Sequence, residues 1–499
     1  MTTDTPFLRP RRRDLLAGSG ALTFAGFTGA GERQAPTTLF PFGVASGDPL
    51  SDRCIIWTRL ARTPLKADGG MPAKPVTVKW FVASASAPAK TLRRGEVRTR
   101  PGLGHSVHVD VTGLAPGQAC RYWFEADGET SPGGLFRTSD PASDTCRLAV
   151  ACCNNYEHGY FTAFDHIADL EPDVLFHAGD YIYEKAAKPG LPRQHIGGEC
   201  MNLTDYRRRY AQYRLDPSMQ RMHAAVPIIA SWDDHEVAGN WAGMYDKQRS
   251  PVFAHRRKAA FQAFYEFMPV RARPAPGWTA LQLYRAFTFG AGLRFFALDT
   301  RQYRSDQACG DKTQRPCDAL HETDRTMLGA AQKSWLEGKL ATLDGGWAVI
   351  GQQVPSYRQI VHDSEGPWIS MDKWDGYPGA QADFHAMLAR YTKGRTLVIS
   401  GDSHAHYLSE LRTDWGDPHT RFGMELTVTS VTSSGDGNER RESWEPLSAQ
   451  NPHIIDHHDR RGFCLIEATR ETLTIQPISF DKISQPGASA LYRKRFEMT

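Results

Sequence analysis

Four apolar runs in this sequence each end abruptly in residue types that bind metal ions. The side chains concerned are Cys153 after residues 148–151, Asp180 and Tyr183 after 173–178, Asp234 and His235 after 226–232, and Asp402 and His404 after 396–400. Buried parallel strands are apolar throughout, and ligands in open α/β sheets bind beyond the carboxyl ends of the strands. We therefore expect the four endings to meet in one site.

The ligand types predict what this site holds. Thiolate and imidazole groups such as Cys153 and His404 suit iron or zinc, whereas carboxylates also suit calcium, magnesium or manganese. Two unlike ligand sets around one carboxylate, Asp180, predict two metal ions about 3.5–4 Å apart. Gly179 allows a sharp turn before Asp180. Tyr183 can turn back onto the same ion, and a phenolate, with a free pKa of about 10, binds readily only to a strongly acidic ion such as ferric iron.

Each of these residues has an ordinary alternative explanation. A buried cysteine at a strand end is usually part of the core, and an Asp-His pair in a loop is usually a hydrogen-bonded turn. Four such endings after four apolar runs favour a common site instead. Cys152 neighbours Cys153, and because side chains alternate along a strand, only one of the two points toward the metals.

From residue 146 onward, strand-like and helix-like segments alternate, which predicts a two-sheet α/β sandwich. Thr204 and Asp205 are typical of the start of a helix. The expected strands are 146–151, 173–177, 226–232, 282–289, 293–299, 347–353, 396–400, 425–429, 462–467 and 472–478, and the expected helices are 161–170, 204–224, 254–267, one around Trp335, and 380–391.

Residues 41–138 are typical of β structure, with polar and apolar residues alternating between glycines and prolines. The segment 114–124 resembles the tyrosine-corner strand of fibronectin-type or immunoglobulin-like sandwiches. The composition of residues 132–144 is typical of a linker. Such a domain usually serves as a packing partner, but Arg59, beside Trp57, could reach across to an anionic substrate.

The N-terminal residues 1–35 are typical of a targeting segment. Arg12 and Arg13 directly precede Leu15 and Leu16, and the small and apolar run that follows carries no charge. This pattern is that of a twin-arginine export signal, and the run is too short and glycine-rich to span a membrane. The alternative is a disordered basic tail. Past residue 31 no apolar run reaches 18 residues, so we expect no membrane span in the mature protein.

Charge and cysteine content narrow the class of protein further. The net charge of +3 falls to +1 without the first 30 residues, so no overall field favours nucleic acid or a membrane as a partner. Nine cysteines suit an exported protein. Cys309 and Cys317 are the best disulfide candidates, and Cys54 and Cys120 could bridge two strands. Because the number of cysteines is odd, at least one thiol cannot form an intramolecular disulfide. We expect Cys153 to be a free thiol that takes part in the chemistry of the site.

Longer motifs around these residues closely resemble one family. They are 150–156, 176–184, 232–236, 298–304 and 401–404, with further matches at 46–49, 57–60, 374–377 and 451–453. These motifs are similar to those of alkaline phosphatase D, a branch of the calcineurin-like metallophosphoesterases. The resemblance spans about residues 40–495. It implies a fibronectin- or immunoglobulin-like β-sandwich at 40–138, followed by a four-layer αββα catalytic domain at 144–495.

The resemblance also implies roles for single residues and an identity for the metals. It implies ferric iron and calcium, in a two- or three-metal site. Two assignments stay open, since Asp233 could take the place of Asp234 and His406 could complete a His-x-His pair. By similarity, the iron ligands are Cys153 and Tyr183, the bridging carboxylate is Asp180, further metal ligands are Asp234, Asp402 and His404, the leaving-group acid is His235, and the phosphate clamp is Arg59.

The resemblance, together with the N-terminal pattern, implies a secreted, metal-dependent phosphatase and phosphodiesterase, exported by the twin-arginine machinery to the periplasm or medium. Two metals and Arg59 would neutralise a phosphate mono- or diester, a metal-bound hydroxide or oxide would attack in line, and His235 would protonate the leaving group. Phosphate acquisition, or turnover of phosphate-containing polymers or lipids, would be its role. We expect no stable complex with nucleic acid.

Two alternatives remain at this point. One is a zinc-dependent esterase or amidase. The other is a non-catalytic wall module whose carboxylates hold structural calcium. Cys153 and Tyr183 argue against the wall module, because structural calcium sites use oxygen ligands and have no use for a thiolate.

Overall fold

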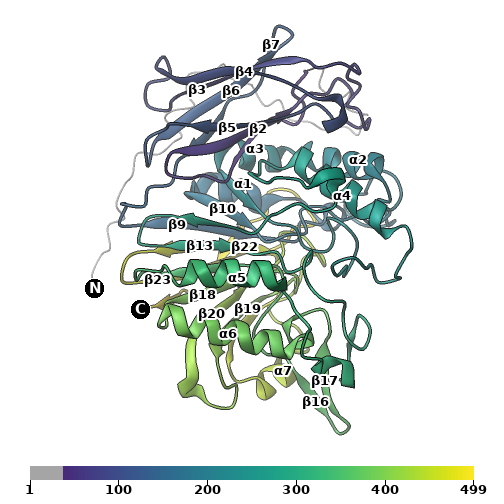
Figure 1. Ribbon diagram of the computed structural model, residues 1–499, viewed down its shortest axis with the longest axis vertical. Coiled ribbons are helices and arrows are strands. Elements are labelled where there is room, and N and C mark those ends of the chain that lie inside the picture. The colour runs from purple at the N-terminus through teal and green to yellow at the C-terminus, as the bar shows by residue number, and fades with distance from the viewer. Residues whose placement is uncertain (1–37) are drawn as a thin grey trace.

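The computed structural model describes residues 38–499 as stacked layers (Figure 1). The proposed export signal at 1–35 lies outside the described residues. From top to bottom, Figure 1 shows a β-sandwich, a layer of helices, two large stacked sheets and a second layer of helices. Within 38–499, no helix combines the length and apolar character that crossing a bilayer requires.

The first large sheet has ten strands and carries three of the four predicted apolar runs in its centre. Its parallel strands β9, β10 and β11 lie side by side. In order, the sheet contains β24 (Ala490–Tyr492), β23 (Leu473–Phe480), β22 (Gly462–Ala468), β9 (Cys146–Ala151), β10 (Val174–His177), β11 (Ile228–Ala230), β1 (Val44–Gly47), β2 (Arg53–Arg59) and β5 (Ser106–Thr112), and β25 (Phe496–Met498) also pairs with β23.

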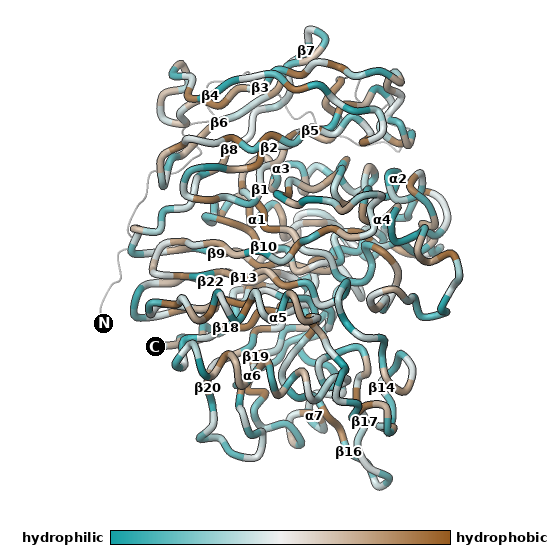
Figure 2. Tube along the Cα trace, in the orientation of Figure 1, coloured by the Kyte–Doolittle hydropathy of each residue, from teal (hydrophilic) through white to brown (hydrophobic). Residues whose placement is uncertain are grey.

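The second large sheet has seven strands and packs face to face on the first. Phe176 of β10 meets Phe295 of β13 with ring centroids 5.0 Å apart, within a core of buried apolar side chains from both sheets. Figure 2 shows these central strands as brown, hydrophobic segments. In order, the strands are β12 (Arg285–Thr288), β13 (Arg294–Ala297), β15 (Ala348–Gly351), β18 (Thr396–Ser400), β20 (Arg421–Thr427), β19 (His406–Arg412) and β21 (Ile454–His458).

Helices cover the outer face of each large sheet, which confirms the predicted αββα order (Figure 1). On the ten-stranded sheet lie α1 (Thr162–Leu170), α2 (Leu203–Arg214), α3 (Pro217–Ala225) and α4 (Phe253–Phe267). On the seven-stranded sheet lie α5 (Gly329–Leu340) and α6 (Pro378–Thr392), and the short α7 (Trp444–Gln450) follows later in the chain.

The prediction of one helix over 204–224 was wrong, because the segment forms two. Pro217 cannot donate a backbone hydrogen bond and occupies the first turn of α3. The Asp216 side chain accepts from the backbone of Met219 at 3.1 Å and so caps this second helix. Asn202, rather than Thr204, caps α2 by accepting from the backbone of Asp205.

The N-terminal region forms the predicted β-sandwich, but the sandwich is fused to the catalytic sheet. Its outer layer contains β3 (Thr77–Ser84), β4 (Thr91–Arg98), β6 (Ala119–Ala126), β7 (Glu129–Thr130) and β8 (Gly134–Arg137). Its inner layer is β1, β2 and β5, and β1 pairs in parallel with β11 through Gly47 and Ile228. One layer of the sandwich is therefore an extension of the ten-stranded sheet.

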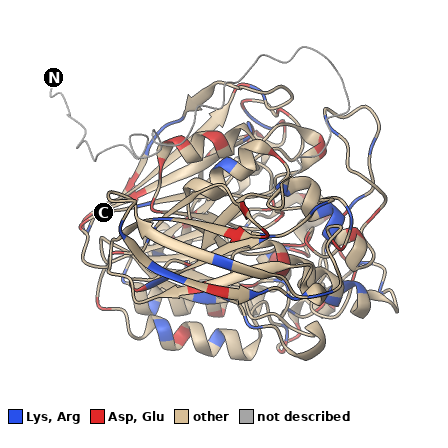
Figure 3. Cartoon of the chain, turned by 90° about the horizontal axis from the view of Figure 1, so that it is seen from above, with Lys and Arg blue, Asp and Glu red and all other residues tan. Residues whose placement is uncertain are grey.

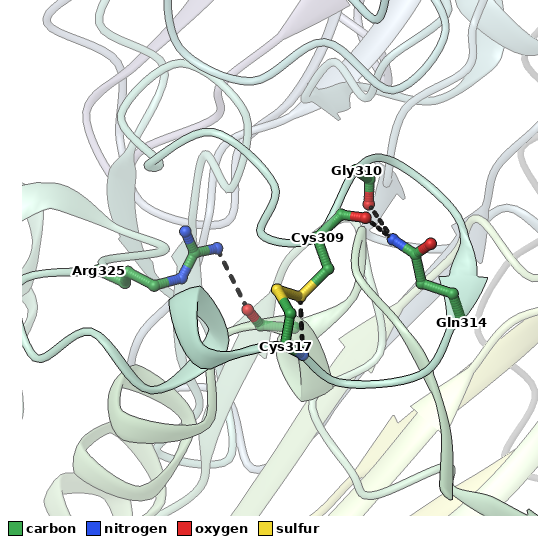
Figure 4. Close-up of a disulfide and its surroundings, with 6 residues drawn as sticks. Cys309, Gly310, Gln314, Cys317 and Arg325 are labelled. Atoms are coloured by element: carbon green, nitrogen blue, oxygen red, sulfur yellow. Dashed lines mark hydrogen bonds between the residues drawn. A yellow bond between two sulfur atoms is a disulfide. The ribbon is translucent and has the colours of Figure 1, made fainter.

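One predicted disulfide is present and the other is not. Cys309 and Cys317 are bonded, with Cα atoms 5.8 Å apart (Figure 4). The loop that they close contains β14 (Thr313–Gln314), which forms a small sheet with β17 (Gly366–Ser370) and β16 (Val361–Asp363). Cys54 and Cys120 are free, buried thiols. The Cys54 thiol contacts the carbonyl of Gly47 at 3.3 Å, whereas the Cys120 thiol contacts the carbonyl of Gln118, just before its own strand, at 3.7 Å.

Candidate metal centre

The four apolar runs do end in one place, where their polar residues form overlapping groups of potential ligands. Asp180 and Asp234 each belong to two groups and so link them. Within each group the ligand atoms lie within 4.8 Å of one another, and the groups are Cys153, Asp180 and His404, then Asp180, Asp234 and His235, then Asp233, Asp234 and Asp402.

The backbone turns that present these side chains are unusual. Cys153, Asp180, Asp402 and His404 all have positive φ angles, between 54° and 61°. Non-glycine residues rarely adopt this conformation, and strain of this kind concentrates at functional sites. Gly179 has a φ of 115°, and a Cβ atom there would lie 2.4 Å from the backbone nitrogen of Asp233. The chain therefore needs glycine at this position, as its sequence indicated.

Cys153 and Tyr183 lie on one side of Asp180. The Tyr183 hydroxyl donates to Asp180 Oδ2 at 2.7 Å and lies 3.2 Å from His404 Nε2. Burial raises the pKa of Cys153 and of Tyr183 well above their usual values, and burial likewise raises the pKa of Asp180. A buried thiol, phenol and carboxyl ionise readily only when a bound cation replaces their protons. This donor set therefore fits a metal ion.

Cys152 does not take part in these groups, which resolves the choice between the two adjacent cysteines. Its thiol contacts the carbonyls of Val428 and Thr429 at 3.7 Å, and it lies against Gly401. Both cysteines are buried in the core between the two large sheets, but only Cys153 belongs to a ligand group.

Three carboxylates form the other side of the site. Asp233 Oδ1 accepts from Arg301 Nε at 2.5 Å, whereas Asp233 Oδ2 is buried without a hydrogen-bond partner. Asp234 Oδ2 accepts from the backbone of Asn240 at 2.7 Å. Because a buried carboxylate oxygen without a partner is costly, the free oxygen of Asp233 fits a cation held together with Asp234 and Asp402. Both Asp233 and Asp234 thus lie in the cluster, and the choice between them stays open.

His235 is held by Glu184, a residue that the sequence did not single out. Its Nδ1 lies 2.6 Å from Glu184 Oε2, and its ring stacks on Tyr183 with centroids 4.2 Å apart. Burial by itself would lower the pKa of this imidazole. The carboxylates of Asp234, Glu184 and Asp180 outweigh burial and raise the pKa of His235 well above its usual value. The imidazole therefore lies among three carboxylates at the edge of the cluster.

Two further buried charges fix the loops around the site. Glu236 accepts backbone hydrogen bonds from Asp180, Tyr181 and Asp233 at 3.1, 2.6 and 2.8 Å, which ties the loop after β10 to the loop after β11. Arg301 joins Asp233 to Asp372, donating to both Asp372 oxygens at 2.8 and 2.9 Å. Both residues lie in motifs that the sequence analysis quoted, but nothing in their spacing indicated these partners.

The structure does not bring Arg59 to this cluster, in contrast to the predicted phosphate clamp. Its guanidinium is fully buried, lies 4.5 Å from the ring centroid of Phe267, and donates to the carbonyl of Gly104 at 2.8 Å. These contacts hold the side chain between the β-sandwich and α4. His406 is also outside the cluster, because its ring stacks on His458 with centroids 4.5 Å apart.

Comparison with known proteins identifies the family. The family model described as "PhoD-like phosphatase" matches residues 148–476. The model described as "PhoD-like phosphatase, N-terminal domain" matches residues 26–140. The chain belongs to the PhoD-like phosphatase family. It is 39% identical to alkaline phosphatase D of Bacillus subtilis (strain 168) over 507 residues, which cover 97% of this chain and 87% of that protein.

Solved structures agree with this family assignment. The "Structure of PhoD" matches with a TM-score of 0.88 and 39% identity, over 92% of this chain and 90% of that chain. A purple acid phosphatase from yellow lupin (Lupinus luteus) matches with a TM-score of 0.55, over 91% of this chain and 73% of that one, but at 14% identity it shows the fold alone. The PhoD-like chain is thus a metal-dependent phosphatase, and the non-catalytic wall module is ruled out.

Proposed function

We propose that this phosphatase hydrolyses phosphate diesters as well as monoesters, by in-line displacement at phosphorus, with ferric iron and calcium as its metals. The proposal is supported chiefly by one observation, the two unlike ligand sets around Cys153 and around Asp233, which the group containing Asp180 and Asp234 links. A thiolate, a phenolate and an imidazole favour iron on one side, and three carboxylates favour calcium on the other. Bound metal ions would neutralise phosphoryl oxygens and activate water for attack.

The chain's own residues supply proton transfer and access. Glu184 accepts the Nδ1 proton of His235, which leaves the Nε2 proton available for a departing alkoxide. The His235 ring is also stacked on Tyr183, so its orientation is fixed before substrate binds. The partly exposed members of the cluster are His235, Asp402 and His404, and these mark the side from which a phosphate ester enters.

We also propose export through the twin-arginine machinery, with a role in phosphate acquisition or in turnover of phosphate-containing polymers or lipids. The support is the Arg12-Arg13 pair before an uncharged apolar run. Folding before export would allow metals to be loaded inside the cell. Basic and acidic residues are interspersed on the face shown in Figure 3, in line with the near balance of charge in the sequence.

Elemental analysis combined with substrate comparison tests the catalytic proposal. Purified protein is expected to contain iron and calcium, and to hydrolyse a bis-nitrophenyl phosphodiester and a nitrophenyl phosphomonoester. A zinc-containing protein that cleaves nitrophenyl acetate but neither phosphate ester would contradict the proposal and favour the esterase alternative. Hydrolysis of the monoester alone would remove the diesterase part.

A further inference from the structure

Lys373 extends to the edge of the cluster that carries Asp402 and His404. Its side chain is partly exposed. The ammonium donates to Ser403 Oγ at 2.9 Å and to Gln359 Oε1 at 3.0 Å. Because Ser403 lies between Asp402 and His404, this contact places a cation next to the partly exposed side of the site.

The backbone around Lys373 is firmly anchored on both sides. Asp372 forms a two-pronged ion pair with the buried Arg301, and Arg304 also donates to it. The Trp374 ring is buried, and its indole nitrogen donates to Gln352 at 3.0 Å. Because both neighbours of Lys373 are fixed, its backbone position is fixed as well. The position of its ammonium therefore varies only with the conformation of its own side chain.

The Lys373 ammonium contacts two side chains, neither of them a carboxylate. The partners of the ammonium are neutral, a hydroxyl and an amide oxygen. An anionic oxygen makes a stronger hydrogen bond to an ammonium than either of these, and could replace them.

Other nearby cations are already engaged by charged or backbone partners. Arg301 is fully buried and is shared between Asp233 and Asp372. Arg441 pairs with Asp459 and donates to the carbonyl of Ser403 at 2.7 Å. Lys185 pairs with Glu184 at 3.1 Å. Lys373 therefore differs from these three in having an ammonium whose charge is not paired directly with a carboxylate.

We propose that Lys373 Nζ binds a phosphoryl oxygen of the substrate, the role that the buried Arg59 cannot fill. This proposal rests on the proposed hydrolysis of phosphate esters at the same site. A purely structural alternative is that Lys373 only pins the turn at Ser403. The two differ in one respect: the structural role depends on the Ser403 hydroxyl, whereas binding of a phosphoryl oxygen does not.

Inorganic phosphate and a nitrophenyl phosphodiester serve as probes, with metal content measured on every sample. Lys373→Met is expected to weaken phosphate binding in calorimetry and to raise KM by about 10- to 100-fold. This is the loss of affinity expected when a hydrogen bond to a charged group is removed. Lys373→Arg should restore most of the loss, since it keeps the charge. Ser403→Ala should change either quantity by no more than about threefold.

A matched control is Lys333→Met on α5, which removes a half-exposed lysine paired with Asp383 on the outer helical layer. It should leave both measurements unchanged. The proposal is overturned if Lys373→Met leaves phosphate affinity and KM near wild type, if Ser403→Ala reproduces its full effect, or if Lys373→Met loses metal. A wild-type protein that binds phosphate through Lys373 but hydrolyses no ester would instead contradict the proposed function alone.

Discussion

At the scale of single residues, Tyr183 offers the most direct test of metal identity. A phenolate bound to ferric iron gives a visible charge-transfer band, so concentrated protein should look violet to brown. Tyr183→Phe should remove this band and change the fold little, because the ring stays stacked on His235. The measurement is the visible absorption spectrum with iron content determined in parallel.

Tyr210→Phe is the matched control for this spectrum. The Tyr210 hydroxyl is also buried, but it has no hydrogen-bond partner, and its ring stacks on Tyr181 and Phe267. The Tyr210→Phe variant should leave the visible band unchanged. A colourless, iron-free wild type with full activity would contradict the iron assignment.

His235 is expected to act on the leaving group. His235→Ala should lower kcat/KM on an alkyl phosphodiester by about 10²–10⁴-fold, the usual contribution of general acid catalysis. The loss should be much smaller on a nitrophenyl ester, because nitrophenolate departs without a proton. Glu184→Gln should show the same pattern with a smaller loss, since Glu184 orients the ring and stabilises its charge.

The decisive comparison is the ratio of the two losses, with metal content measured on the same samples. Equal losses on both esters with metals retained would remove the acid role. Because His235 also lies within ligand distance of Asp180 and Asp234, loss of metal from His235→Ala would make it a ligand instead.

Residue types after apolar runs were enough to predict the ligand cluster, because strand ends gather polar side chains at one edge. Glu184 and Glu236 were missed, since carboxylates that bind a neighbour's backbone or imidazole look like any other acidic residue in sequence. Arg59 was misplaced for a related reason: the sequence shows a cation beside an aromatic ring, but not that the ring of Phe267 and the carbonyl of Gly104 enclose it.

At the scale of elements, the turn after β10 depends on Gly179. Gly179→Ala should lower the free energy of unfolding by more than about 2 kcal/mol, because it adds backbone strain to a steric clash with Asp233. It should also lose metal, since the clash displaces Asp180. Denaturant unfolding and elemental analysis provide the measurements.

Gly190→Ala separates the clash from the strain. Gly190 also has a positive φ, of 82°, but a Cβ atom there would meet nothing within 4 Å. This variant should show only a small loss of stability and full metal content. Equal behaviour of the two variants would mean that contact with Asp233 is unimportant.

Elements were predictable where the sequence pattern is local. The strands β9, β10 and β18 follow from short apolar runs bounded by polar residues, and they lie where expected. The break between α2 and α3 was missed because the helical pattern continues on both sides of Pro217. The parallel pairing of β1 with β11 joins residues about 180 positions apart, and no local pattern carries that information.

At the scale of the whole molecule, the proposed export depends on the N-terminal residues 1–35. Replacing Arg12 and Arg13 with lysine should retain the protein in the cytoplasm in a folded, metal-loaded form, because the charge is kept but the paired guanidinium groups are lost. Cell fractionation with an activity assay measures this. Normal levels of the double variant outside the cytoplasm would contradict the twin-arginine assignment.

Stability should fall with rising pH because of Glu425, a buried carboxyl on β20 that accepts from Ser356 and Ser400. Burial raises its pKa from 4.5 to about 7. Below pH 4.5 this group is neutral in both folded and unfolded chains. Between pH 4.5 and 7 only the unfolded chain ionises, so up to about 3 kcal/mol of stability is lost as the pH rises. The neighbouring His385 stays neutral in this window, since burial lowers its pKa to about 3.

Glu425→Gln removes this titration and should therefore be most destabilising at low pH, relative to the wild type, and least so above pH 7. The measurement is the difference in unfolding free energy between variant and wild type at pH 5 and pH 8, which cancels contributions from other groups. Glu445→Gln, an exposed change on α7, is the control and should give the same small difference at both values. If the difference for Glu425→Gln is also independent of pH, the buried carboxyl is ionised in the folded chain throughout, and the seven-stranded sheet accommodates its charge.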